Sequence, residues 1–157
     1  QVDANIDNKS FTQSLSIIEY LNETRGLDLL PKDHAKRARV TALAYAIAID
    51  IHPICNLSVS SFAEEISGEE NYKQKWMKKF IGPGLEAFEK LLEDFPKGSY
   101  SVGETPSLPE ICLIPQIYNA MRWEVDIAHL SRINSIIQSC NKHPAFINAH
   151  PDFFKPS

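Results

Sequence analysis

The chain has 157 residues, of which 16 are basic and 20 acidic, with a formal net charge of -4 and 43% hydrophobic residues. This length and composition are typical of one globular domain, or of one domain with part of another. The mild acidity and mixed charges weigh against a nucleic-acid interface, and no apolar run is long enough to cross a bilayer, so we expect neither partner.

The first segment predicts a β-hairpin followed by one helix. Two short strands are expected at residues 2–6 and 9–12. A helix is expected to begin at Ser14 and to end at Gly26, which can act as a left-handed cap. Because a hairpin and one helix cannot form a core on their own, residues 1–25 are interpreted as the end of a larger α/β unit.

The rest of the chain, residues 26–157, predicts an all-α bundle of four to six helices. Asp33 is a suitable N-cap for the first of them. Apolar residues recur at helical spacing from there to Ile51, and the helix is expected to continue beyond Pro53.

Three further helices are expected in the second half of the chain. They are residues 69–92 with a Gly-Pro-Gly bend, residues 111–123 and residues 131–140. Ser107 and Glu110 form a capping-box pattern before the second of these helices. That helix is almost entirely apolar and is therefore expected to be buried.

The stretch from residue 50 to residue 58 (DIHPICNLS) carries the strongest functional signal. A proline inside a helix removes one hydrogen bond and clashes with the preceding turn. Pro53 is therefore expected to kink the helix beside His52, Asn56 and Ser58, with His52 and Asn56 on one helix face. Such a cluster is typical of the wall of a pocket for a small polar ligand. The alternative is that His52 only caps carbonyl groups freed by the proline.

Two further positions are candidates from their chemistry alone. Gln13 and Ser14 stand where a helix begins, and free amides and the helix dipole favour a carboxylate there. The alternative is that Ser14 is only an N-cap. Arg122 ends the apolar helix, its planar guanidinium suits a carboxylate, and a buried charge there would need a partner. The alternative for Arg122 is an internal pair with Glu124 or Asp126.

The three cysteines bear on the compartment. Cys55, Cys112 and Cys140 are odd in number and widely spaced, which fits neither a disulfide framework nor a metal motif. Without a secretory signal pattern, the simplest interpretation is a reducing, cytoplasmic environment. No metal site is expected, and Cys55 is interpreted as a small buried hydrophobic residue.

Several segments, spread over the whole chain, carry a resemblance to one family. They are residues 13–21 (QSLSIIEYL), 30–33 (LPKD), 50–57 (DIHPICNL), 102–108 (VGETPSL), 115–122 (PQIYNAMR), 144–146 (PAF) and 150–152 (HPD). Together they resemble the zeta class of glutathione transferases, the maleylacetoacetate isomerase family. Most glutathione transferases share the capping box, whereas the proline kink and residues 119–122 point to the zeta class.

The resemblance implies a fold and an activity. The implied fold is mainly α: a glutathione-transferase C-terminal bundle at residues 26–157, preceded by the end of a thioredoxin-like domain at residues 1–25. The implied activity is glutathione-dependent cis–trans isomerisation of maleylacetoacetate, as in tyrosine breakdown, with glutathione transferase activity. In this family the glutathione thiolate adds to the cis double bond and leaves after rotation. The implied substrates are dioic or α-halo acids, and the implied assembly is a homodimer.

The resemblance also assigns roles to individual residues. The glutathione contacts that it implies are Gln13, Ser14, His52, Asn56, Leu57 and Ser58. The substrate-carboxylate contacts that it implies are Arg122, His52 and Asn56. The family's thiol-activating motif has no counterpart in this sequence, so no catalytic residue is assigned. The kink and Arg122 are expected to face Gln13 and Ser14 across one cavity. The competing hypothesis is a non-catalytic transferase-like helical module that serves protein–protein contacts.

Overall fold

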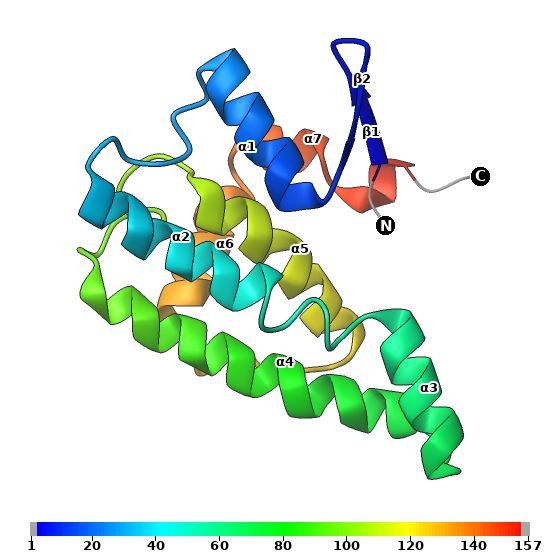
Figure 1. Cartoon of the computed structure of the whole chain (residues 1–157). Helices are drawn as coiled ribbons and strands as arrows, with labels where there is room; N and C mark the ends of the chain where they lie inside the picture. Colours follow the sequence, from blue (N-terminus) through cyan, green and yellow to red (C-terminus); the bar gives the residue numbers. More distant parts are fainter. Residues whose placement is uncertain (1–2, 155–157) are drawn as a thin grey trace.

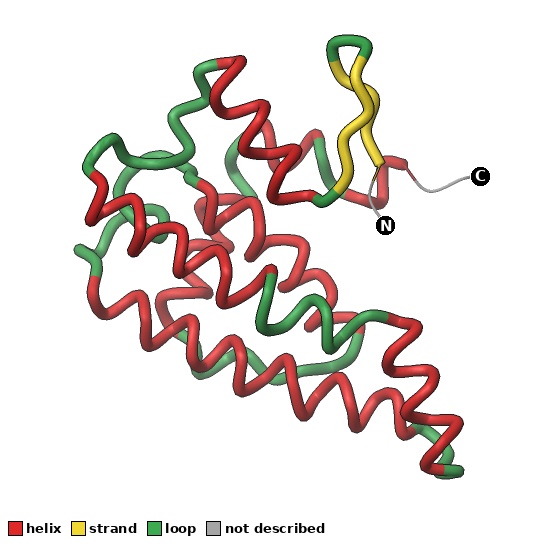
Figure 2. The backbone as a smooth tube through the Cα atoms, in the orientation of Figure 1, coloured by secondary structure: helices red, strands yellow, loops and turns green. Residues whose placement is uncertain are grey.

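The computed structural model describes residues 3–154 and consists of helices with one two-stranded sheet (Figures 1 and 2). The strands are β1 (Asp3–Ile6) and β2 (Lys9–Thr12). The helices are α1 (Ser14–Arg25), α2 (His34–Ala48), α3 (Leu57–Ser67), α4 (Tyr72–Leu91), η1 (Leu92–Asp94), α5 (Leu108–Arg122), α6 (Ser131–Cys140), α7 (Pro144–Asn148) and η2 (Pro151–Phe154). Within residues 3–154, none of the helices combines the length and apolar character that a membrane span requires.

The hairpin and α1 form one unit, as the sequence predicts. Asp7 and Asn8 take φ values of 52° and 60°, and positive φ at both positions is the signature of a type I′ turn. The Asp7 carboxylate accepts hydrogen bonds from Arg25 Nη2 at 2.6 Å and from the Tyr20 hydroxyl at 2.9 Å. These bonds tie the tip of the hairpin to α1. Val2, the predicted first residue of the strand, lies outside the described residues.

Three predicted helix boundaries are confirmed. Gly26 ends α1 in the left-handed conformation with φ 60°. The Asp33 side chain caps α2 by accepting from the Lys36 amide at 2.8 Å. The Glu110 carboxylate, fully buried, accepts from the Ser107 amide at 2.8 Å and from its hydroxyl at 2.9 Å, which completes the capping box.

The core lies where α2, α4 and α5 pack against one another, with α6 against α5 (Figure 1). The fully buried apolar side chains of these helices form it: Val40, Leu43, Ile47, Met77, Ile81, Leu85, Phe88, Leu113, Ile133 and Ile136. Helix α3 packs on the far end of α4 and projects from the bundle (Figure 1). The expectation of a buried α5 is confirmed along most of its length.

The predicted continuation of the second helix past Pro53 is wrong. Helix α2 ends at Ala48, residues 49–55 form successive turns, and α3 is a separate helix capped by Asn56. Pro53 has no amide hydrogen and clashes with the preceding turn, so the helix stops well before it. We call residues 49–56 the elbow.

Helix α4 differs slightly from the prediction. It begins at Tyr72 rather than at residue 69 or 70, because Asn71 takes a left-handed φ of 62° just before it. The helix then runs through Pro83 without a break. A Cβ on Gly84 would lie 2.6 Å from the Ile51 side chain. This glycine therefore allows the elbow to pack closely against α4.

Candidate functional site

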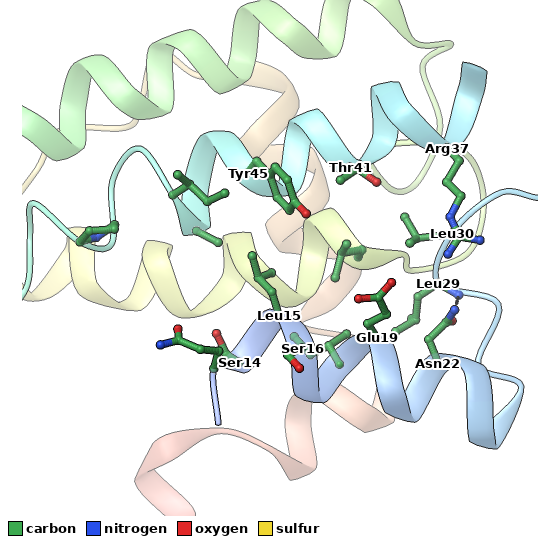
Figure 3. A pocket seen from close by; sticks show the side chains of 16 residues that line it. Ser14, Leu15, Ser16, Glu19, Asn22, Leu29, Leu30, Arg37, Thr41 and Tyr45 are labelled. Carbon is green, nitrogen blue, oxygen red and sulfur yellow. Dashed lines mark hydrogen bonds between the residues drawn. The ribbon is translucent and has the colours of Figure 1, made fainter. Parts of the chain in front are cut away.

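A groove of about 560 Å³ runs between α1 and α2 (Figure 3). Ser14 lies toward one end of this groove and Arg37 toward the other (Figure 3). The polar residues that line it are Gln13, Ser14, Ser16, Glu19, Asn22, Arg37, Thr41 and Tyr45. Pro53 brings the elbow into the same lining. Most of these residues gave no signal in the sequence, because only the tertiary fold places α1 and α2 on opposite sides of one groove.

The start of α1 has an unusual backbone. Gln13 takes φ 69° and ψ 116°, a strained conformation for a residue other than glycine. Gln13, and not Ser14, is the N-cap, so the interpretation of Ser14 as a simple cap is wrong. The helical hydrogen bonds begin at the Ile17 amide, which donates to the Gln13 carbonyl at 3.0 Å. The earlier amides of the first turn therefore have no acceptor within the helix and favour an anionic group.

His52 lies in the elbow and is half-buried. Among residues 3–154 its imidazole makes no hydrogen bond or ion pair, so the alternative of a carbonyl cap is wrong. One carbonyl group of the elbow, Ile54 O, instead accepts a hydrogen bond from the Trp76 indole at 2.9 Å. Burial lowers the pKa of His52 below its ordinary value of 6.5. The imidazole is therefore neutral at pH 7. It can donate one hydrogen bond and accept another, but it supplies no positive charge.

Asn56 and Ser58 are exposed and interact with each other at the start of α3. The Asn56 Oδ1 atom accepts from the Ser58 amide and from its hydroxyl, both at 3.0 Å. Asn56 is thus an N-cap, and the prediction that it shares a helix face with His52 is wrong. The neighbouring Leu57 side chain is 53% exposed. The elbow therefore presents a polar and an apolar group to solvent beside His52.

Arg122 ends α5 at the surface, so the expectation of a buried charge there is wrong. Its guanidinium lies over the Trp123 ring, 5.8 Å from the ring centroid, and forms no ion pair within the described residues. Glu124 is engaged by Lys78 at 3.5 Å, and Asp126 accepts from the Ala128 amide at 2.9 Å. The alternative of an internal pair with either acid is therefore wrong, and the guanidinium is open to an external anion.

The groove tests the expectation of a single cavity. Gln13, Ser14 and Pro53 line one hollow, as expected for the kink and the start of α1. Arg122 is not among the residues that line this groove, and neither are His52 and Asn56. The expectation therefore holds for Pro53 but not for His52, Asn56 or Arg122. Arg122 lies at the C-terminal end of α5.

The cysteines have the character of core residues. Burial raises the pKa of Cys55 to about 11, that of Cys112 to about 11 and that of Cys140 to about 12. All three are free thiols, and they are protonated at neutral pH. The described part of the chain holds no group of three or more His, Cys, Asp or Glu residues that could bind a metal ion.

Comparison with known proteins places the chain in a family. The maleylacetoacetate isomerase of Rhizobium meliloti is 48% identical over 153 residues, which cover 96% of this chain and 72% of that protein. A holo structure of maleyl pyruvate isomerase, described as a bacterial zeta-class glutathione transferase, superimposes with a TM-score of 0.90. It is 34% identical and covers 95% of this chain and 72% of its own. No protein-family model matches the chain.

Several solved relatives contain ligands. The maleylacetoacetate isomerase of Anaeromyxobacter dehalogenans was solved with dicarboxyethyl glutathione and citrate in its active site. Its TM-score is 0.87 at 32% identity, with 96% of this chain and 68% of that chain covered. The fold is therefore that of a glutathione transferase, with the hairpin and α1 preceding the helical bundle. The chain belongs to the maleylacetoacetate isomerase family of zeta-class glutathione transferases.

Proposed function

We propose that this protein is a glutathione-dependent cis–trans isomerase of the maleylacetoacetate type, with glutathione transferase activity. The observation that carries the proposal is the 48% identity to the Rhizobium meliloti isomerase over 96% of the chain. The substrate class is a dioic acid or an α-halo acid. Residues 1–25 belong to a thioredoxin-like domain and residues 26–157 to the C-terminal helical domain. The protein acts as a homodimer in the cytoplasm.

The start of α1 fits one end of glutathione. Gln13 and Ser14 are exposed, and the first-turn amides have no acceptor within the helix. A carboxylate of the γ-glutamyl end would satisfy these donors and the helix dipole. His52, Asn56, Leu57 and Ser58 contact the remainder of the cofactor from the elbow. Bound glutathione supplies the thiolate nucleophile.

Arg122 binds a carboxylate of the substrate. Its guanidinium has a permanent charge, has no ion-pair partner in residues 3–154, and can bind a carboxylate through two parallel hydrogen bonds. The neutral His52 and the free amide group of Asn56 add hydrogen bonds without charge. Recognition of the substrate's negative charge thus depends on Arg122, and orientation of the bound substrate depends on the elbow.

The proposal is tested by isomerisation of maleylacetoacetate with and without glutathione. We expect turnover, followed by absorbance, only when glutathione is present, together with retention on immobilised glutathione. Glutathione-independent turnover would contradict the proposed cofactor. Absence of both turnover and retention would favour the non-catalytic helical module.

Replacement of Arg122 tests the role of its charge. Arg122→Ala should lower kcat/KM for a dioic acid by about 10- to 100-fold, the value of one hydrogen bond to a charged group. Conjugation of an uncharged substrate should change by less than about twofold, because that reaction uses no carboxylate contact. Arg122→Lys, which keeps the charge but loses the planar fork, should give an intermediate result. Equal losses for both substrates would contradict the proposed role.

A further inference from the structure

We propose that Trp123, held in place by Asn119, is a positioning residue for the Arg122 guanidinium. The inference rests on the proposed function, because it assumes that Arg122 binds a carboxylate. It adds two residues that contact neither the substrate nor the cofactor. Their effect is to fix the direction in which the guanidinium faces before the ligand arrives.

The first observation is the isolation of Arg122. Its side chain is exposed at the end of α5, and within residues 3–154 its one side-chain interaction is with the Trp123 ring, 5.8 Å from the ring centroid. A free arginine side chain samples many rotamers, and binding a ligand would have to immobilise them. A cation over an aromatic face is attracted to the ring and so spends more time in one place. The ring therefore reduces the entropy that carboxylate binding would lose.

The second observation is the anchoring of Trp123 itself. The indole is half-buried against the core, and its Nε1 donates to Asn119 Oδ1 at 3.1 Å. The Trp123 amide also donates to the carbonyls of Asn119 and Ala120, both at 3.2 Å. The backbone, the core contact and the side-chain bond thus fix the plane of the ring. A phenylalanine would keep the aromatic face but lose the bond to Asn119.

The third observation is that the neighbouring acid is directed elsewhere. Glu124 takes a left-handed φ of 55°, which turns the chain away at the end of the helix. Its carboxylate accepts from Gln74 Nε2 at 2.8 Å and pairs with Lys78. The carboxylate nearest in sequence is therefore held by α4 and does not compete for Arg122. The guanidinium therefore remains open to a carboxylate of the substrate.

Binding of maleate, a four-carbon cis dicarboxylate, tests the inference by titration calorimetry with glutathione present. Trp123→Ala and Asn119→Ala should each weaken maleate binding by about two- to fivefold, the value of one exposed cation–π contact. Trp123→Phe should recover part of the loss. Arg39→Ala is the matched control, because Arg39 also lies over a ring, that of Phe95 at 5.1 Å. This control should bind maleate as the unmodified protein does.

Tryptophan emission provides a readout that a purely structural role would not change. The chain has two tryptophans, so replacing either one identifies the source of a signal. Maleate should change the emission of the unmodified protein and of Trp76→Phe, but not that of Trp123→Phe. In steady-state kinetics, the Trp123 and Asn119 variants should raise KM for a dioic acid and leave that for an uncharged substrate unchanged.

The outcomes separate the two proposals. Unchanged maleate binding by Arg122→Ala would overturn the carboxylate role of Arg122 and the present inference with it. Weak binding by Arg122→Ala, together with unchanged binding by Trp123→Ala and Asn119→Ala, would overturn only the positioning role. If Trp123→Ala fails to fold, Trp123→Phe and Asn119→Ala decide the question, because both keep the apolar contact with the core.

Discussion

The start of α5 and the elbow between α2 and α3 are alike in sequence but differ in how their polar groups are used. Each has a proline, Pro109 or Pro53, next to an ionisable side chain. At the start of α5, the buried Glu110 carboxylate accepts from the Ser101 amide at 2.7 Å as well as from Ser107. In the elbow, the half-buried His52 imidazole has no partner in residues 3–154.

This difference distinguishes polar groups that stabilise the fold from polar groups that are available to bind a ligand. Buried polar groups are nearly always hydrogen-bonded, since an unpaired one destabilises the protein. Glu110 meets this requirement through its own chain, so its role is structural. The half-buried His52 does not meet it, and the exposed Arg122 has no ion-pair partner in residues 3–154. Polar side chains that lack a partner within the chain therefore indicate the ligand-binding site better than polar character alone.

Removal of Glu110 is expected to have the largest effect on stability. Glu110→Ala leaves the buried amides of Ser101 and Ser107 without an acceptor, which should lower the free energy of unfolding by about 3 kcal/mol or more. Urea titration measures the change. The matched control is Glu93→Ala at an exposed site, for which we expect a change within about 0.5 kcal/mol. Similar values for the two variants would show that the Glu110 carboxylate does not stabilise the start of α5.

Gly84 tests whether apolar packing fixes the elbow. The methyl group of Gly84→Ala would lie 2.6 Å from the side chain of Ile51, which is only 1% exposed. We expect a loss of about 1–3 kcal/mol in the free energy of unfolding, as for other overpacked cores.

A second glycine of the same helix serves as the control. In Gly82→Ala the nearest atom is Val125 Cγ1 at 3.8 Å, an ordinary contact. That variant should be neutral, or more stable by up to about 1 kcal/mol through helix propensity. A Gly84→Ala protein as stable as Gly82→Ala would indicate that the elbow shifts freely, contrary to the proposed packing.

Local signals made most of the fold predictable. The turn at Asp7-Asn8, the cap at Asp33 and the capping box at Ser107 each depend on residues within a few positions of one another. Asn56 shows the limit of such reasoning. Its spacing to Ser58 is that of an N-cap, whereas its spacing to His52 predicts a shared face of one continuous helix. The resemblance to a family suggested a role but not the local conformation.

The features that could not be predicted from the sequence depend on packing between residues far apart in the chain. The polar lining of the groove comes from α1 and α2, and no spacing in the sequence relates Glu19 to Arg37 or Tyr45. The exposure of Arg122 was also missed, because the apolar run before it suggested burial. Its neighbour Trp123 and the engagement of Glu124 by α4 became evident only once the helices were in place.

The smallest expected effect is a pH dependence of stability at the elbow. Burial lowers the pKa of His52 from 6.5 in the folded chain, so the unfolded chain binds a proton more readily. Stability from the neutral imidazole is therefore complete above pH 6.5 and decreases as the pH falls toward the lower folded value. His52→Gln cannot be protonated and should lose less stability between pH 7.5 and pH 5.5 than the unmodified protein.

Urea unfolding at these two pH values measures the effect. The other histidines are present in both proteins, so their contributions cancel in the difference. Bound glutathione should enlarge the pH dependence if it hydrogen-bonds to the neutral imidazole, because the protonated form would then lose that bond as well. An identical pH dependence with and without His52 would mean that the imidazole is solvated in the folded state. The elbow would then no longer differ from an ordinary surface turn, and its contrast with the hydrogen-bonded Glu110 at the start of α5 would have no basis.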